Sequence, residues 1–60
     1  MFYTVKFFVE NKLIGPYQFL SDFIFKNEDI AKEYANRFIA TCDDADVMIN
    51  FIIVSFYPAE

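Results

Sequence analysis

Two stretches, one near each end of the chain, carry apolar residues at a period of two, which predicts two long β-strands. In the first, residues 2–10, the more uniformly apolar set is Tyr3, Val5, Phe7 and Val9, and the opposite set is Phe2, Thr4, Lys6 and Phe8. In the last, residues 47–57, the two sets are Ile49, Phe51 and Ile53 against Met48, Asn50, Ile52, Val54 and Phe56. Neighbours along a strand point to opposite faces, so we expect the first set of each strand in the core.

A hairpin follows the first strand. Asn11 and Lys12 favour a tight turn, and residues 13–19 form a second apolar run. A three-residue loop over residues 10–12 keeps one face apolar, because it pairs Val9 with Leu13, Val5 with Tyr17 and Tyr3 with Phe19. A two-residue loop would place Gln18 in the core. Pro16 has no N–H to donate, so this strand should be an edge strand or contain an irregularity.

The middle of the chain predicts one helix. Asn27 is a good N-cap, and Glu28 and Asp29 follow where the helix dipole favours negative charge. Apolar residues at helical spacing make a stripe of Ile30, Ala31, Tyr34, Ala35, Phe38, Ile39 and Cys42. Glu33 and Arg37 have the stabilising four-residue order. The run Phe23–Phe25 is too short to classify: it extends the second strand after a bulge or begins a longer helix capped by Ser21.

The resulting order is ββαβ in one domain, residues 1–60. It predicts an α+β fold, a three-stranded and mainly antiparallel sheet with one helix packed on one face. If the last strand joins the first, the first strand is central.

One helix can cover only one face of this sheet. The uncovered face would hold seven apolar residues, a larger patch than soluble monomers usually expose: Phe2, Phe8, Ile14, Met48, Ile52, Val54 and Phe56. We expect first a homodimer interface, formed by face-to-face packing or by edge-strand pairing. The alternatives are a different protein partner, or cover by long polar side chains and the C-terminal tail.

The composition of the chain argues against several classes of function. A chain with 57% hydrophobic and 23% charged residues should fold, and its net charge of −4 disfavours contact with nucleic acid or a membrane surface. No stretch reaches the ~18–20 apolar residues of a membrane span, and no basic region precedes an apolar leader, so we expect a cytoplasmic protein. One cysteine and no histidine leave no disulfide and no metal cluster. We expect Cys42 to be a small buried residue.

The chain also lacks the usual residues of catalysis. Without histidine, neither serine nor cysteine has the base that activates it, and a single glycine cannot build a phosphate-binding loop. An enzyme would need a carboxylate such as Asp22 or Asp46 in a cleft that raises its pKa. We therefore expect no enzyme and no cofactor.

Three acids, Asp43, Asp44 and Asp46, form the densest charged cluster. They follow the predicted helix C-terminus, where the dipole disfavours negative charge. They are either a solvated turn that improves solubility or an anionic patch that docks onto a basic cleft of another protein.

Two functional hypotheses follow. The first is a non-enzymatic, homodimeric interaction module that binds and inhibits or regulates another protein. Small size and acidity suit an inhibitor of mobile-element or phage type that acts on a basic, nucleic-acid-handling partner, although no residue motif supports this. The second is a dimeric small-ligand sensor or carrier with an apolar pocket between subunits.

Overall fold

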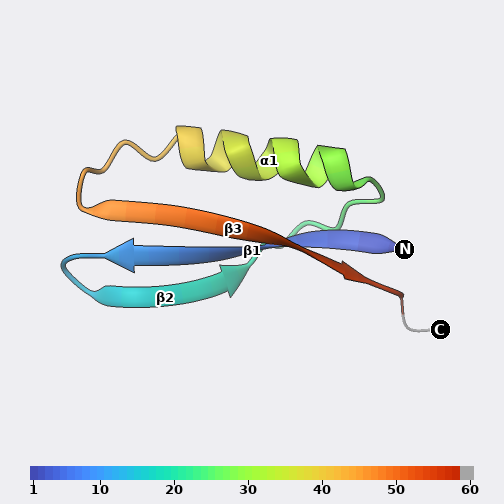
Figure 1. The fold of residues 1–60 in the computed structure, drawn as a ribbon, viewed down its shortest axis with the longest axis horizontal. Helices are drawn as coiled ribbons and strands as arrows, with labels where there is room; N and C mark the ends of the chain where they lie inside the picture. The colour runs from blue at the N-terminus through green and yellow to red at the C-terminus, as the bar shows by residue number, and fades with distance from the viewer. Residues whose placement is uncertain (59–60) are drawn as a thin grey trace.

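A three-stranded antiparallel sheet forms one layer of the protein and a single helix forms the other (Figure 1). The computed structural model describes residues 1–58. Its elements are β1 (Phe2–Asn11), β2 (Gly15–Leu20), α1 (Glu28–Ala40) and β3 (Val47–Phe56). The sheet order is β2-β1-β3, so the predicted α+β fold, the order ββαβ and the central position of the first strand are confirmed.

The β1–β2 hairpin has a different register from the one predicted. Val9 lies opposite Tyr17 rather than Leu13, and Asn11 lies opposite Gly15. The turn is residues 12–14, because the Asn11 side-chain oxygen accepts hydrogen bonds from the backbone N–H groups of Leu13 (2.8 Å) and Ile14 (3.3 Å). Gly15 then takes a φ of 91°, a conformation that side chains disfavour.

The predicted register is thus wrong by four residues, yet the assignment of faces survives. A shift by an even number of residues leaves every side chain on its own side of the sheet. Tyr17 and Phe19 therefore still share a face with Val9 and Phe7.

Pro16 occupies a position where its missing N–H is harmless. Tyr3 and Phe25 exchange two backbone hydrogen bonds of 2.7 Å, so by alternation the odd-numbered residues of β1 bond toward the β2 side. Pro16 lies opposite the even-numbered Glu10 and faces the solvent edge of the sheet. The predicted edge position of this strand is confirmed.

The segment between β2 and α1 continues along the edge of β1. After an irregular stretch, Phe25 pairs with Tyr3 in an isolated bridge. The Ser21 hydroxyl accepts from the backbone N–H of Phe23 (3.1 Å), and the Thr4 hydroxyl donates to the Phe23 carbonyl (3.0 Å). The helical alternative is wrong, because Ser21 caps no helix. The strand alternative holds for Phe25 alone, which pairs with β1, whereas Phe23 and Ile24 belong to no strand.

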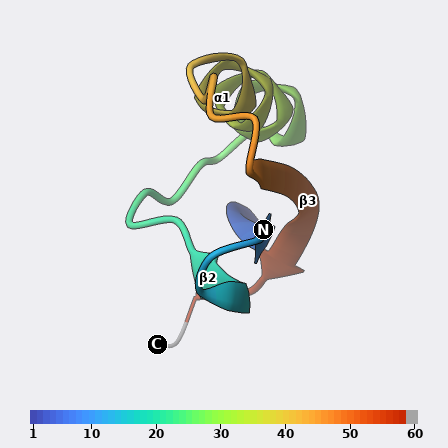
Figure 2. The same cartoon turned by 90° about the vertical axis from the view of Figure 1, so that its left-hand side faces the viewer.

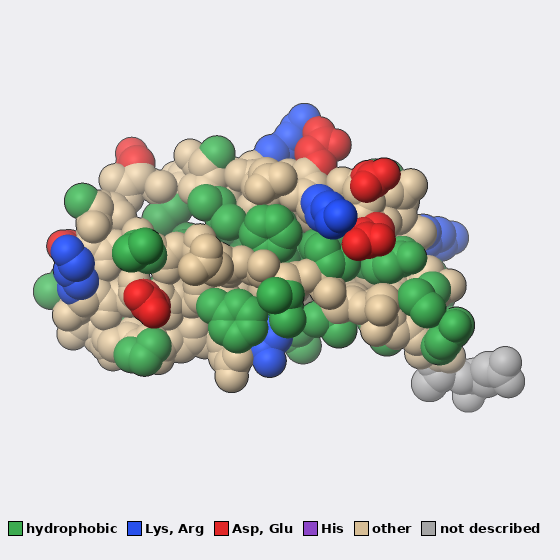
Figure 3. All heavy atoms as spheres, viewed as in Figure 1, with side chains coloured by type: hydrophobic (Ala, Val, Ile, Leu, Met, Phe, Trp, Pro, Cys, Tyr) green, Lys and Arg blue, Asp and Glu red, His purple; other side chains and the backbone are tan. Residues whose placement is uncertain are grey.

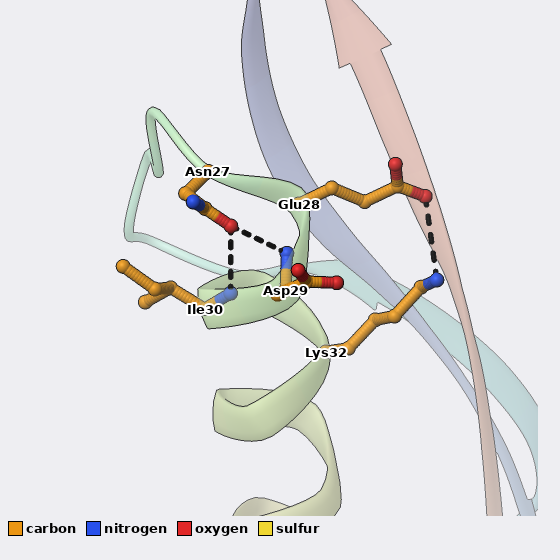
Figure 4. Close-up of polar contacts among 5 residues, drawn as sticks. All are labelled: Asn27, Glu28, Asp29, Ile30 and Lys32. Atoms are coloured by element: carbon orange, nitrogen blue, oxygen red, sulfur yellow. Dashed lines mark hydrogen bonds and ion pairs between the residues drawn. The ribbon is translucent and has the colours of Figure 1, made fainter.

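Helix α1 begins where the sequence predicts. The Asn27 side-chain oxygen accepts from the backbone N–H groups of Asp29 (2.7 Å) and Ile30 (3.4 Å), as Figure 4 shows. Two exposed ion pairs lie on the helix, Lys32 with Glu28 (3.5 Å) and Arg37 with Glu33 (2.7 Å). In each pair the two partners are four residues apart, about one helical turn. The cap supplies partners for amides that no earlier turn can satisfy.

The core is small. Val5, Phe7, Ala31 and Ala35 are fully buried, and Val9 is nearly so. The two alanines let the helix approach the sheet closely, while the larger rings of Tyr34 and Phe38 pack on Phe7 at 6.3 and 4.5 Å between centroids. Two members of the predicted stripe differ from expectation: Ile30 is 54% exposed, and Cys42 lies beyond the helix end, half-buried.

The molecule is elongated. Its extents are 41 × 19 × 14 Å, and its radius of gyration is 12.7 Å against roughly 10.4 Å for a compact chain of this length. Its accessible surface of 4705 Å² exceeds by about 600 Å² the ~4,100 Å² expected of a folded 7.1 kDa monomer. The excess accords with the elongated shape and with apolar side chains exposed on the sheet, in the hairpin turn and in the segment before α1.

Candidate functional site

The face of the sheet that points away from α1, called the open face below, is the main candidate site. Figure 2 shows the helix on one side of the strands and no described element on the other. Residues paired across the three strands form rows on this face. The three complete rows, written from β3 to β2, are Met48–Glu10–Pro16, Asn50–Phe8–Gln18 and Ile52–Lys6–Leu20.

Three of the seven predicted interface residues lie in these rows and are solvent-exposed. Met48 is 63% exposed, Ile52 50% and Phe8 37%. The structure therefore brings together apolar side chains from the central strand and from β3. Hydrophobic side chains alternate with isolated acidic and basic ones over the strands in Figure 3.

The other four predicted residues are placed differently. Phe2, Val54 and Phe56 lie toward the far end of the open face and are half-buried, with the Phe2 and Phe56 rings 6.2 Å apart. Ile14 lies in the hairpin turn, 73% exposed, and not on a strand. Its predicted place on the sheet followed from the incorrect register.

Sequence reasoning missed two apolar residues of the open face. Leu20 lies opposite Lys6 and is 56% exposed, and Pro16 lies opposite Glu10. Their alternation with Tyr17 and Phe19 was visible in the sequence, but only the true register places them beside the exposed residues of β1.

Polar residues interrupt the open face on its central strand. Thr4 is buried, and its hydroxyl is satisfied by the Phe23 carbonyl. The Lys6 ammonium lies 5.5 Å from the centroid of the Phe8 ring, within cation–π range. Glu10 is exposed two residues beyond Phe8.

A second apolar region lies on the helix side, beside β2. The helix packs over β1 and β3, and so Tyr17 and Phe19, expected in the core, remain 46% and 36% exposed. They help to line an open cleft of about 260 Å³, together with Val9, Phe38, Thr41, Cys42, Asp44, Val47 and Ile49. The only ring of α1 that reaches Phe19 is Phe38, at 6.1 Å, among the described residues.

The acidic loop sits at the hairpin end of the molecule. Asp43, Asp44 and Asp46 are all exposed. The Asp44 carboxylate accepts from the backbone N–H of Asp46 (2.9 Å), and the Asp46 carbonyl accepts from the backbone N–H of Lys12 (3.0 Å). These bonds tie the loop to the β1–β2 turn and hold the three carboxylates at one end of the sheet.

Among residues 1–58, no three side chains of the metal-binding types come together, and no helix is long and apolar enough to cross a membrane. Comparison with protein-family models, with curated proteins and with solved structures finds no match.

Proposed function

We propose that this chain is a non-enzymatic, homodimeric interaction module that binds and inhibits or regulates another protein. The observation that carries the proposal is the exposure of Phe8, Met48, Ile52 and Leu20 on one face of the sheet. Exposed apolar side chains that gather on one face mark interaction surfaces in soluble proteins.

The energetic argument rests on the apolar area that remains in water. The surface excess of about 600 Å² compares with roughly 800 Å² per partner in an interface of standard size. At ~25 cal/mol per Å², covering about 300 Å² of apolar surface would favour association by about 7.5 kcal/mol before the entropy of association is subtracted. Burial of this apolar surface against another protein surface is thus sufficient to drive association. The small core makes such burial an important part of the total apolar burial of the domain.

The acidic loop supplies the second surface of the proposal. Asp43 and Asp44 lie outside the rows of the open face, so a homodimer on that face leaves them available to a basic partner. Asp46 lines a cleft together with Met48, Glu10 and Pro16 and therefore lies at the border of that face. Charge of one sign speeds encounter with an oppositely charged surface and selects against acidic partners. The cytoplasmic location expected from the sequence remains a prediction.

The test is to place a charge on the open face. Phe8→Asp and Ile52→Asp should each convert the wild-type dimer into a monomer, because the introduced carboxylate would have to be desolvated in the interface. Sedimentation velocity across a concentration series measures the mass. Leu13→Asp is the matched control: Leu13 is apolar, 82% exposed and in the hairpin turn, so its replacement should leave the dimer intact.

A wild-type chain that stays monomeric at the highest soluble concentration would remove the homodimer from the proposal. Equal effects of Phe8→Asp and Leu13→Asp would show that added charge, and not the open face, governs association.

A further inference from the structure

The side chains of the open face form a pattern that is complementary to itself. Lys6 and Glu10 lie two residues before and after Phe8 on the central strand. Each is flanked in its row by two apolar residues, Lys6 by Ile52 and Leu20, and Glu10 by Met48 and Pro16. The row between them has Phe8 at its centre with an amide side chain on either side, Asn50 and Gln18.

Two copies of the chain can pack with their open faces together, related by a two-fold axis that lies between the sheets, runs perpendicular to the strands and passes through the Phe8 position. In this arrangement the complementary rows face each other. Such an axis reverses the strand direction, so the Lys6 row of one copy faces the Glu10 row of the other. Apolar side chains then meet apolar ones, Ile52 with Met48 and Leu20 with Pro16, and each ammonium meets a carboxylate. Phe8 faces its own copy, as do Asn50 and Gln18.

The other symmetric arrangements lack this match. A two-fold axis parallel to the strands would place Lys6 against Lys6 and Glu10 against Glu10, and like charges that face each other in an interface oppose association. Pairing along the outer edge of β3 would leave Phe8 and Leu20 in water, because β3 would separate each β1 strand from the seam. Face-to-face packing through Phe8 is the arrangement that covers the exposed residues and pairs the charges.

Resting on the proposed function, we propose that a second copy of this chain covers the open face in this two-fold geometry, with two reciprocal ion pairs between Lys6 and Glu10. Two sheets packed face to face lie about 10 Å apart, a distance that the interdigitated side chains of Phe8, Ile52, Met48 and Leu20 fill. The apolar neighbours in each row shield the ion pairs from water. The pairs therefore set the orientation of the two copies more than their affinity.

Charge reversal tests the geometry. Lys6→Glu alone and Glu10→Lys alone should each weaken the homodimer by about tenfold or more, because like charges then face each other twice. An equimolar mixture of the two variants should associate as a heterodimer with an affinity near that of the wild type. In the mixture, the introduced glutamate meets the introduced lysine, and Glu10 of the first variant meets Lys6 of the second. Sedimentation velocity with one variant carrying a fluorophore measures the heterodimer.

The controls separate pairing from overall charge. Glu10→Lys changes the net charge from −4 to −2, so a non-specific repulsion would predict a tighter dimer, whereas the ion-pair geometry predicts a weaker one. Lys12→Glu changes the net charge by the same amount as Lys6→Glu but lies in the hairpin turn, and it should leave the affinity within about twofold of the wild type. Circular dichroism of each variant confirms that it is folded.

The decisive outcome is the mixture. If it associates no better than either variant alone while the wild type dimerises and Phe8→Asp dissociates it, this two-fold geometry is overturned and the interaction module stands. If the wild type does not dimerise, both the geometry and the homodimer in the proposed function fall.

Discussion

Phe7 lies at the centre of the ring cluster that joins the sheet to the helix. It is fully buried and packs against Phe38, Phe19 and Tyr34, with centroids 4.5, 5.2 and 6.3 Å away. A single aromatic side chain buries 150–250 Å², and ring pairs add about 0.5–1.5 kcal/mol beyond that burial. With so few fully buried residues, one side chain carries a large share of the core.

Phe7→Ala should therefore abolish the fold. The expected loss is about 3–5 kcal/mol, which equals the roughly 3–5 kcal/mol that one core supplies in a domain of this size. Urea unfolding followed by circular dichroism measures it. Ile14→Ala in the exposed turn is the comparison and should change the free energy of unfolding by less than about 0.5 kcal/mol. A cooperative transition of Phe7→Ala within 1 kcal/mol of the wild type would contradict this account of the core.

At the scale of elements, the β1–β2 and β2–α1 junctions are set by side chains that bind the backbone. Asn11 closes the hairpin, Thr4 holds the segment after β2, and Asn27 starts α1. These bonds occupy amides and carbonyls that the ladders and the helix leave unpaired. The order of elements thus depends on a few local polar contacts as much as on the apolar pattern.

Asn27→Ala measures the contribution of the helix cap. Loss of the two bonds to the first-turn amides should lower the free energy of unfolding by about 1 kcal/mol. The matched control is Asn36→Ala, the same exchange at an exposed position inside the helix, which should be neutral or slightly stabilising because alanine is the better helix former. Chemical denaturation of both variants provides the comparison. Equal losses at the two positions would show that Asn27 stabilises the protein by some route other than the cap.

At the scale of the whole molecule, the acidic loop forms the densest cluster of charge, whereas Lys6 and Glu10 lie among the apolar side chains of the open face. The acidic loop lies beyond the C-terminal end of α1, where its carboxylates face the negative end of the helix dipole. The ion pairs within 4 Å among the described residues lie on the helix, away from this loop. The three carboxylates are therefore exposed to solvent and take part in neither of these ion pairs.

Replacing all three acids, by Asp43→Asn, Asp44→Asn and Asp46→Asn together, should separate binding from stability. The net charge changes from −4 to −1, and the domain should gain about 0.3–1 kcal/mol at low ionic strength, a gain that disappears in 1 M salt. If the loop docks onto a basic partner, affinity capture from the native host should lose that partner with this variant and, for the wild type, with rising salt. Capture of the same protein by both chains at every salt concentration would leave the loop as a solvated turn.

Much of the fold was predictable because the spacing of apolar residues, two along a strand and about 3.6 along a helix, depends on local backbone geometry and not on tertiary structure. Alternation along β1 and β3 and the helical stripe after Asn27 predicted the elements and most of the core, whereas the strand order followed only on the condition that the last strand joins the first. The hairpin register was not predictable in the same way. Two registers four residues apart put the same side chains on the same faces, and the choice depended on hydrogen bonds of Asn11 and on the φ of Gly15.

For the candidate site, too, part of the arrangement was predictable from the sequence and part depended on the strand register. The sequence by itself determined that Phe8, Met48 and Ile52 face away from the helix, since a strand's period of two fixes their side. Only the tertiary structure decided that Leu20 and Pro16 join them, that Ile14 does not, and that Lys6 and Glu10 lie in rows related by symmetry about Phe8. Alternation fixes the face on which a side chain lies, whereas the register fixes its neighbours across the sheet. The register depends on contacts between residues on different strands and in the turn, and alternation along one strand carries no information about these contacts.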